Sequence, residues 1–518
     1  MGVLVGVAWL PWSDEAFARA KASDRPVVLD IGASWSHGCR VMDETTYADP
    51  EVVELLTRDY VPVRVDRDQR PDVDDRFNLG GWPTTAFLTP DGKLLGGTTY
   101  ADRGQMKQLL VQLKTGWIQH RAMINEEIDR RDQKIAEALE KPLPTLGAVT
   151  MEVFRKTVRG IVSTFDSLHG GFGQAPKFPL PGSLRVVLQA LEETQGPDFH
   201  AVLVKTLDAI GDRGLRDAER GGFFHYVTTN HWTTPRFEKL CEDNAQLIRI
   251  FLDAAGTAGV EKYLERAREA LGWVRGTLLD PDRGVFFGSQ AADDDWYAAD
   301  PKVRAAKPAP PVDRVVYVNA SSQMASAFLR ASEVLGEPEW ARAALKGLEW
   351  TLREMVRDGR VAHYHDGEPR LWDLARDPIA LAAACLDAYD FTGQASWLEA
   401  ADRLAADLPK RFWSEVEKGL VDRAADAPGL GDLARGRRTI PENGLAAGVL
   451  ARLWRLTGNE EHRRWADRLL RAFPDFLDGY GHETAEYATA ADWLVREPRP
   501  VPRTPEGLRA YVPRRIVT

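Results

Sequence analysis

The chain has 518 residues, of which 44% are hydrophobic and 28% are charged, values typical of a folded globular protein. Its length allows roughly three domains and is ample to bury a core without disulfides or metals. The net charge of −10 argues against a general nucleic-acid binder, which needs a basic surface.

The cysteine content and the apolar segments bear on the cellular compartment. The three cysteines, Cys39, Cys241 and Cys385, lie far apart, and an odd, sparse set does not make a disulfide framework, so we expect a reducing cytoplasm. The apolar start, Met1–Trp12, carries no Lys or Arg and is interpreted as a buried entry strand rather than a signal peptide. No uncharged apolar run reaches about 18 residues, so we expect no membrane span.

The first 120 residues alternate between strand and helix patterns. Residues 26–32 and 60–66 are apolar runs typical of buried strands, and Asp49 before Pro50 predicts a helix N-cap. Residues 84–89 and 93–96 flank a Pro-Asp-Gly turn and predict a hairpin, which is followed by a helix from about residue 103. These elements predict a small α/β domain over residues 1–120.

A charged helical stretch follows this domain and ends at Pro142-Leu-Pro144, which we predict to be a domain boundary closing a linker over residues 121–144. Beyond it, glycine-led helical segments recur at Gly259, Gly336, Gly393 and Gly458, and Gly-aromatic segments recur at residues 170–173, 221–224, 284–287 and, more weakly, 419–421. Ala- and Leu-rich helices lie between these markers. A helix that is apolar on most sides must be surrounded by other helices.

We therefore predict that residues 145–518 form five or six helix pairs closed into an α/α toroid, that is, an (α/α)6 toroid. The Gly-aromatic loops are expected at one end of it, around a pocket. An open solenoid is the alternative.

One candidate site is the turn between the first strand and the next helix, which contains Ser36-His37-Gly38-Cys39. A Cys-x-x-Cys there would place a thiolate at a helix N-terminus, where its pKa falls. With Ser36 in the first position, the lone Cys39 cannot complete an intramolecular dithiol cycle. Pro83, in Gly80-Gly-Trp-Pro83, leads into a strand, and a cis peptide could form before it.

These segments carry a resemblance to a known family. Residues 9–100 resemble the thioredoxin-like domain of the spermatogenesis-associated, thioredoxin-domain-containing family. The matching pieces are Trp9-Leu-Pro-Trp12, Glu15-Ala-Phe17, the 34–42 segment, Val65-Asp-Arg67, Arg70-Pro-Asp-Val-Asp74, Gly80-Gly-Trp-Pro83 and Phe87-Leu-Thr-Pro-Asp-Gly92. The family motif usually reads Cys-His-Trp-Cys-His, so the resemblance implies a thioredoxin motif in which Ser36 replaces the first cysteine.

The rest of the chain is similar to the second part of that family, a six-hairpin toroid related in fold to sugar epimerases and glycosidases. The matching pieces are residues 170–173 and 175–179 with Lys177, and Trp232, Pro235 and 237–239 with Lys239. The resemblance implies polar pocket positions at Asp243, Gln290, Asn319 and Asn443. His225 and Arg236 depart from the family pattern, which has His-Arg at positions 224 and 225 and a histidine at position 236.

Reasoning from the residues alone adds two candidate catalytic carboxyls, Glu238 and Asp243, because glycoside chemistry needs two carboxyl groups facing one bond and epimerisation needs an acid and a base. A structural ion pair between Glu238 and Lys239 is the alternative. His363-Tyr-His365 has no third ligand nearby, so we expect no metal. The sequence contains no phosphate-binding glycine loop, so we expect no cofactor.

Three functions are compatible with the sequence. The first is a toroid that binds or processes a sugar or another small polar ligand, with the thioredoxin-like domain kept to dock a protein partner. The second is a redox protein acting through mixed disulfides at Cys39. The third is a binding scaffold without catalysis. A membrane or nucleic acid is not among the expected partners.

Overall fold

The computed structural model describes residues 6–141, 146–194, 197–427, 429–473 and 477–518. These residues form two compact units. The first unit comprises the described residues of Met1–Pro142, Ala291–Asp294 and Asp426–Gly436, and the second comprises the remainder. The predicted boundary at Pro142-Leu-Pro144 lies outside the described residues.

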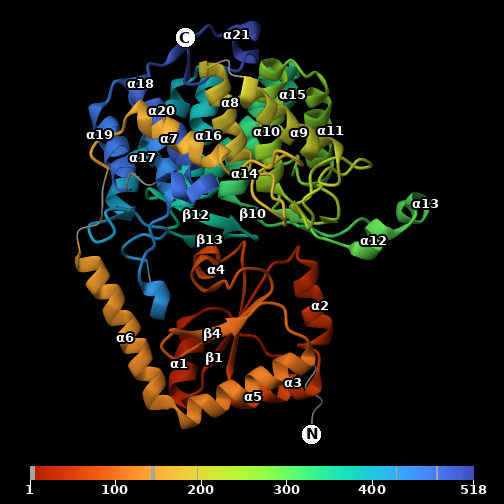
Figure 1. The fold of residues 1–518 in the computed structure, drawn as a ribbon, viewed down its shortest axis with the longest axis vertical. Helices are drawn as coiled ribbons and strands as arrows, with labels where there is room; N and C mark the ends of the chain where they lie inside the picture. The colour runs from red at the N-terminus through yellow and green to blue at the C-terminus, as the bar shows by residue number, and fades with distance from the viewer. Residues whose placement is uncertain (1–5, 142–145, 195–196, 428, 474–476) are drawn as a thin grey trace. The chain divides into compact units, whose positions relative to one another are not determined.

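The first unit is built on one four-stranded sheet of order β2-β1-β3-β4 (Figure 1). Strands β1 and β2 are parallel, whereas β3 is antiparallel to both β1 and β4. The strands are β1 (Val27–Gly32), β2 (Val61–Asp66), β3 (Thr84–Leu88) and β4 (Leu94–Thr98). The helices are α1 (Asp14–Ser23), α2 (His37–Thr45), α3 (Pro50–Asp59), α4 (Pro71–Phe77), α5 (Arg103–Gln119) and α6 (Arg121–Glu140), with the short η1 (Gly431–Ala434).

Strand alternation explains the two cores of this unit. Val27, Leu29 and Ile31 point to one face and pack in a cluster with residues of α1 and α4, whereas Val28 points to the other face with residues of α2, α3 and α5. The predicted N-cap is confirmed, since the Asp49 side chain accepts from the first backbone N–H groups of α3. The thioredoxin-like α/β fold predicted from the sequence is therefore confirmed.

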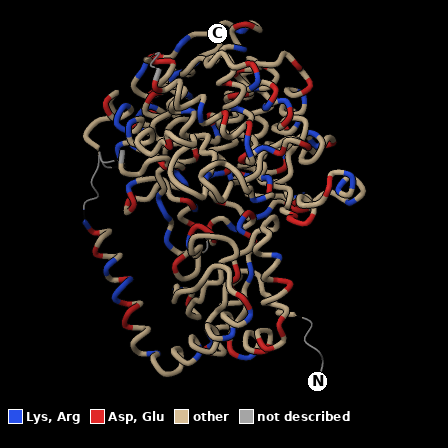
Figure 2. Tube along the Cα trace, turned by 45° about the vertical axis from the view of Figure 1, so that its right-hand side comes forward, with Lys and Arg blue, Asp and Glu red and all other residues tan. Residues whose placement is uncertain are grey.

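The two remaining segments of this unit are its N-terminal residues and helix α6. Of the predicted entry strand Met1–Trp12, the first five residues lie outside the described residues, and Leu10 forms an isolated parallel bridge with Val63. None of the residues of helix α6 is fully buried, and Figure 2 shows basic and acidic residues interspersed along its trace. Its apolar residues Ile124, Ile128 and Leu139 are half-buried.

The second unit is a double ring of helices. The inner helices are α8 (Pro181–Thr194), α10 (Cys241–Ala258), α14 (Val318–Leu335), α16 (Arg376–Thr392), α18 (Ile440–Thr457) and α20 (Ala485–Val495). The outer helices are α7 (Met151–Val162), α9 (Pro197–Asp212), α11 (Lys262–Thr277), α15 (Pro338–Glu354), α17 (Ala395–Phe412) and α19 (Glu460–Arg471). Each inner helix packs on the next, and α20 packs back on α8, so the ring closes in the described part of the chain. The predicted (α/α)6 toroid is confirmed over the open solenoid.

Short strands and turns join these helices. They are β5 (Tyr226–Val227), β6 (Pro235–Arg236), β7 (Lys239–Leu240), β8 (Ser289–Gln290), β9 (Val312–Asp313), β10 (Val316–Tyr317), β11 (Val356–Arg357), β12 (Arg360–His365), β13 (Pro369–Trp372), β14 (Trp413–Ser414), β15 (Gly419–Leu420), β16 (Arg499–Val501) and β17 (Arg515–Val517). The remaining helices are α12 (Asp294–Ala298), α13 (Pro301–Ala305), η2 (Leu477–Thr484) and α21 (Pro505–Arg509). Strands β12 and β13 lie at one end of the ring, and α21 lies at the other end (Figure 1).

The recurring glycines have a clear structural role. Gly259, Gly336, Gly393 and Gly458 each stand directly after an inner helix, with φ between 67° and 73°, and end that helix in the left-handed conformation. A glycine adopts this conformation without a Cβ penalty, so the chain can reverse into the following outer helix. The sequence repeat is thus a repeat of inner-helix ends.

Candidate functional site

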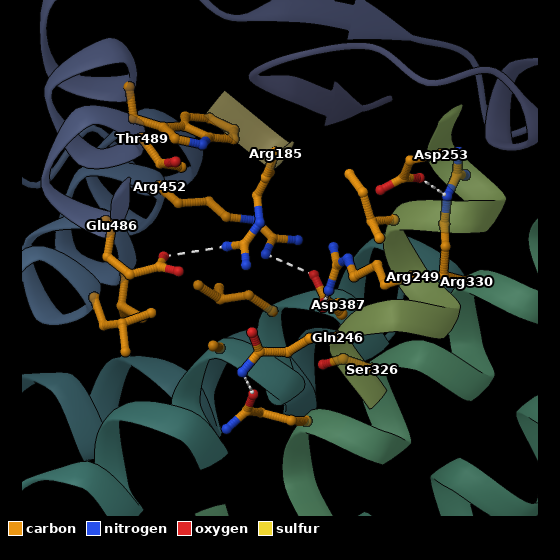
Figure 3. Close-up of a pocket in the computed structure, with 18 of the residues that line it drawn as sticks. Arg185, Gln246, Arg249, Asp253, Ser326, Arg330, Asp387, Arg452, Glu486 and Thr489 are labelled. Atoms are coloured by element: carbon orange, nitrogen blue, oxygen red, sulfur yellow. Dashed lines mark hydrogen bonds and ion pairs between the residues drawn. The ribbon is translucent and has the colours of Figure 1, made fainter. Parts of the chain in front are cut away.

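The toroid contains a partly open cavity of about 310 Å³, which we call the axial cavity. It is lined by all six inner helices and by the C-terminal segment. Its polar lining comprises Arg185, Gln189, Glu242, Gln246, Arg249, Asp253, Gln323, Ser326, Arg330, Asp387, Asp390, Arg452, Glu486, Thr489, Tyr511, Arg514 and Arg515. Figure 3 shows the guanidinium groups of Arg185 and Arg452 extending into the space between the helices. Charged and polar groups therefore share the lining with apolar side chains such as Ile250, Ile379 and Leu386.

Helical periodicity brings these side chains to the cavity. On α10, Arg249 and Asp253 stand three and seven residues after Gln246, and this spacing places the three side chains on one face of the helix. The same spacing holds for Glu486, Thr489 and Trp493 on α20. Helix α10 thus directs a polar stripe to the axis, whereas α18 contributes the single polar residue Arg452.

The central charges are ion-paired across the ring. Asp387 of α16 lies 2.6 Å from Arg249 of α10 and 2.7 Å from Arg452 of α18, and Arg452 also lies 2.7 Å from Asp390. Burial alone would raise the pKa of Asp387, but the two guanidinium groups hold it well below its ordinary value. At Asp390 burial prevails over Arg452 and raises the pKa. Asp387 is therefore firmly ionised at neutral pH.

A second group of charges joins the inner helices to the C-terminal segment. Arg330 donates to Asp253 at 2.6 Å and to Glu333 at 2.9 Å, and Arg515 donates to the same Glu333 at 2.7 Å. Arg330 also donates to the backbone carbonyl of Leu508. The C-terminal segment is thus held to the inner helices by charge-assisted hydrogen bonds.

The remaining polar groups offer mixed donors and acceptors. Gln323 donates to Glu242 at 3.1 Å and accepts from Gln246 at 2.9 Å, while Arg185 donates to Glu486 at 3.1 Å. Polar groups of both kinds that converge on an enclosed space are the usual composition of a small-ligand site.

A second pocket, of about 470 Å³, adjoins the axial cavity, and we call it the loop-end pocket. Pro181 lines both spaces, and Asp243 of this pocket follows Glu242 of the axial cavity in the sequence. His225 Nδ1 lies 2.6 Å from the Asp243 carboxylate, and the Phe178 ring lies 5.4 Å from the His225 ring. His482 also lines the pocket. The structure therefore brings together two of the predicted site residues, His225 and Asp243.

The two predicted lysines have their ammonium groups occupied by the Gly-aromatic loops. Lys177 is fully buried, and it donates to Asp166 at 2.9 Å and to the carbonyl of Gly173. Lys239, equally buried, donates to Asp217 at 2.7 Å. Burial lowers the pKa of Lys239 to about 8 even though Asp217 opposes the shift. These contacts stabilise the loop conformation.

Two more predicted residues have partners in the Gly-aromatic loops. Asn443, the fourth residue of α18, donates to the carbonyls of Leu420 and Thr439 and accepts from the Leu420 N–H. Asn244, the fourth residue of α10, makes the same contacts with Phe223 and Leu240, so this arrangement repeats around the toroid.

Trp232 is fully buried and donates to the Gly170 carbonyl, and an added Cβ on Gly171 would come within 2.4 Å of the Trp232 ring. Gln290 accepts from the Trp273 indole and donates to the Pro310 carbonyl.

The other predicted positions lie near the N-termini of inner helices. Glu238 is buried just before β7, and its backbone carbonyl accepts from the His225 N–H. Asn319 is half-buried at the second position of α14. Neither residue lines the axial cavity or the loop-end pocket.

The thioredoxin-type turn has the expected backbone. Ser36 caps α2 by accepting from the Cys39 N–H at 3.4 Å, and the peptide bond before Pro83 is cis. Burial raises the pKa of the Cys39 thiol to about 11, although hydrogen bonds from Ser36 and the Ala33 N–H oppose the shift. Cys39 is therefore a protonated thiol at neutral pH.

A distant segment covers this turn within the first unit. The Ala292 N–H donates to the Trp35 carbonyl at 3.0 Å, and Arg40 donates to the Ala292 carbonyl at 3.0 Å. His37 Nε2 lies 3.8 Å from a carboxylate oxygen of Asp294. Residues Ala291–Asp294 thus lie along the start of α2.

The described residues contain neither a group of metal ligands nor a helix suited to a membrane. Among the described residues, no three His, Cys, Asp or Glu side chains are grouped so that they could hold a metal ion. The His363 ring pairs with the Asp377 carboxylate at 3.0 Å. Within the same described residues, no helix has the length and apolar character that a membrane crossing requires.

Sequence reasoning missed the arginines and aspartates of the axial cavity. Arg249, Arg330 and Arg452 each stand between apolar neighbours within an Ala- and Leu-rich helix. A charged group on a helix buried on all sides must find a partner inside the protein, and this was the signal that could have identified the cavity.

The fold and its sites define a two-module protein, a thioredoxin-like domain joined to an (α/α)6 toroid. Residues 4–140 match the family described as "Protein of unknown function, DUF255" (Thioredox_DsbH). Spermatogenesis-associated protein 20 from Homo sapiens is 24% identical over 90% of this chain and 76% of its own length. The resemblance to the spermatogenesis-associated, thioredoxin-domain-containing family is therefore confirmed.

Two further similarities cover parts of the chain. Uncharacterized protein B0495.5 from Caenorhabditis elegans is 33% identical over 48% of this chain, and the match spans 36% of that relative's length. A crystal structure of D-mannose isomerase covers 66% of this chain and 96% of its own, with 12% identity and a TM-score of 0.52. At that identity the similarity establishes the toroid fold alone.

Proposed function

We propose that the toroid binds a sugar or a similar small polar ligand in the axial cavity. The observation that carries the proposal is the convergence of guanidinium, carboxylate and amide groups from six inner helices on one partly open space of about 310 Å³. That volume lies at the lower end of the range for small-molecule sites, roughly 300–1,000 Å³. Trp493 and Tyr511 add aromatic surface, and the similarly folded D-mannose isomerase is named for a sugar substrate.

For chemistry on the ligand, we propose the His225–Asp243 pair of the loop-end pocket. A carboxylate 2.6 Å from Nδ1 orients the imidazole, and an imidazole oriented in this way can exchange a proton with a bound molecule. Proton abstraction beside a carbonyl, the step of an epimerase or isomerase, needs such a group. Glu238, the other carboxyl predicted from the sequence, lines neither space. It is proposed to support the loops around the ligand together with the polar residues Lys177, Lys239, Gln290, Asn319 and Asn443 and the aromatic Trp232.

The thioredoxin-like domain is proposed to act without dithiol exchange, in a reducing cytoplasm. Ser36 supplies no second thiol, and burial keeps Cys39 protonated. These features favour a role in docking a protein partner over the redox hypothesis.

The binding proposal is tested by calorimetry on the full chain with a panel of monosaccharides and their acidic derivatives. We expect at least one panel member to bind, and we expect Gln246→Ala to weaken that binding about tenfold because one ligand hydrogen bond is lost. The control is Gln394→Ala on the exposed surface. An absence of binding across the panel would overturn the proposal.

The catalytic proposal has its own test. The bound sugar is incubated in D₂O, and incorporation of deuterium at the carbon beside its carbonyl is followed by NMR. We expect His225→Gln to abolish incorporation while binding persists. Binding without any exchange in the wild type would leave the toroid a binding scaffold.

A further inference from the structure

Exposure of charge in the axial cavity is uneven. The side chains of Arg249 and Arg185 are 37% and 31% exposed, whereas their partners Asp387 and Glu486 are 9% and 18% exposed. Both arginines line the cavity, and Figure 3 shows Arg185 reaching into it. The charge that a ligand would meet on these two walls is therefore mainly positive.

Each of these two guanidinium groups has donors to spare. A guanidinium carries five N–H groups in a planar fork. In the described part of the chain, Arg249 donates to Asp387 through Nη1, and Arg185 donates to Glu486 through Nη1. The Nε and Nη2 groups of both arginines remain available to a ligand.

The carboxylates of the cavity are, by contrast, largely engaged. Asp387 accepts from both Arg249 and Arg452, and Asp253 accepts from Arg330. Glu242, half-buried, accepts from Gln323 on the wall formed by α10 and α14. A neutral polyol would satisfy some of the spare donors with hydroxyl oxygens, but an anionic group would satisfy them with the stronger charge-assisted bonds.

We infer that the axial cavity selects a sugar-sized ligand carrying one anionic group, a carboxylate or a phosphate, held by Arg185 and Arg249. This inference rests on the proposed function and adds the substrate class. Guanidinium groups suit both anions because the fork matches two oxygens of either one.

The test compares four probes on the full chain by calorimetry: D-glucose, D-glucuronate, D-glucose 6-phosphate and inorganic phosphate. We expect one of the two sugar anions to bind at least about tenfold more tightly than glucose, since charge-assisted bonds are roughly twice as strong as neutral ones. Whichever anion binds identifies its source as carboxylate or phosphate.

The variants separate the anion contact from the fold. Arg249→Gln should reduce the preference for the anion about tenfold, whereas Arg249→Lys should retain part of it because the charge remains. Arg452 still pairs with Asp387 in both variants, so the carboxylate is not left alone. Arg185→Gln independently removes the second guanidinium group proposed to hold the anion. Arg268→Gln, at an exposed ion pair with Glu337, is the matched control and should change nothing.

Each other outcome has a defined meaning. Equal binding of glucose and the two sugar anions would overturn the inference and leave the proposed function standing. Inorganic phosphate binding as tightly as the sugar phosphate would overturn the assignment of a sugar. If none of the four probes binds, the inference is overturned and the result also counts against the proposed function. An anion preference unchanged by both Arg249→Gln and Arg185→Gln would also overturn the inference.

Discussion

Arg249 of α10 donates to Asp387 of α16 at 2.6 Å, although α14 stands between these two helices in the ring. Arg452 of α18 approaches the same carboxylate at 2.7 Å. One buried aspartate therefore links three inner helices. The ion pairs of the axial cavity stabilise the closed toroid as well as line its site.

This relationship predicts the effect of neutralising Asp387. In Asp387→Asn, the largely buried Arg452 and the partly exposed Arg249 lose their shared counter-charge. Removal of one member of a fully buried ion pair costs about 3–5 kcal/mol, and because solvent screens Arg249 we expect a loss of about 2–3 kcal/mol. We expect that loss in the free energy of unfolding, measured by urea denaturation with tryptophan fluorescence. Glu152→Gln removes an ion pair whose two side chains are exposed and should leave the free energy of unfolding nearly unchanged. Equal effects of the two variants would contradict the stabilising role of Asp387 in the toroid.

Two glycines of α18 provide a matched test of helix packing in the ring. A Cβ at Gly444 would lie 2.5 Å from the Tyr487 backbone nitrogen of α20, whereas a Cβ at Gly448 would lie 3.8 Å from the Ala490 Cβ. We expect Gly444→Ala to destabilise the toroid by about 1–3 kcal/mol through overpacking. Gly448→Ala should stabilise it by about 0.5–1 kcal/mol because alanine favours the helix. Thermal unfolding measures both, and a Gly444→Ala variant as stable as the wild type would refute the close approach.

The buried pair Asp166–Lys177 predicts a dependence of stability on pH. Burial raises the pKa of Asp166, but the hydrogen bonds from Lys177 and from the His169 and Leu168 N–H groups prevail and lower it to about 2. The unfolded value is about 3.9, so the unfolded chain takes up the proton first as the pH falls. The stabilisation is complete above the unfolded pKa and is lost as the pH falls through the folded one.

The measurement is the free energy of unfolding at pH 5 and at pH 3. We expect the decrease between the two to be about 1 kcal/mol smaller in the double variant Asp166→Asn/Lys177→Met than in the wild type. The double variant removes both charges, so neither is left buried alone. Identical decreases would show that Asp166 is not linked to stability in this range.

Much of the fold could be predicted because local signals agree with the tertiary structure. Asp49 before Pro50 predicts a helix start, and the structure begins α3 there. The recurring glycines identified the toroid repeat, although Gly393 ends an inner helix rather than opening an outer one. The pattern could not decide this, because a glycine between two helices belongs equally to either sequence segment.

The candidate site was less accessible to sequence reasoning. Asn443 and Lys239 are polar residues near the Gly-aromatic loops, and the sequence does not reveal that they hydrogen-bond the loops themselves. Arg249 and Asp387 are 138 residues apart and meet only through closure of the ring. A polar residue in an apolar helix indicates a buried partner, but the identity of that partner depends on the topology.

The last prediction concerns the thioredoxin-type turn. Because burial raises the pKa of Cys39 to about 11, alkylation by iodoacetamide at pH 7 should be about two orders of magnitude slower than for an ordinary thiol with a pKa of about 8.5. In Ser36→Cys, a second thiol stands at the N-cap of α2, where the helix terminus favours the thiolate, and we expect faster alkylation and an oxidised form with an intramolecular disulfide. Mass spectrometry before and after reduction measures both, with Ser36→Cys/Cys39→Ser as the variant that cannot form the disulfide. Rapid alkylation of Cys39 in the wild type would contradict the burial argument and reinstate the redox hypothesis.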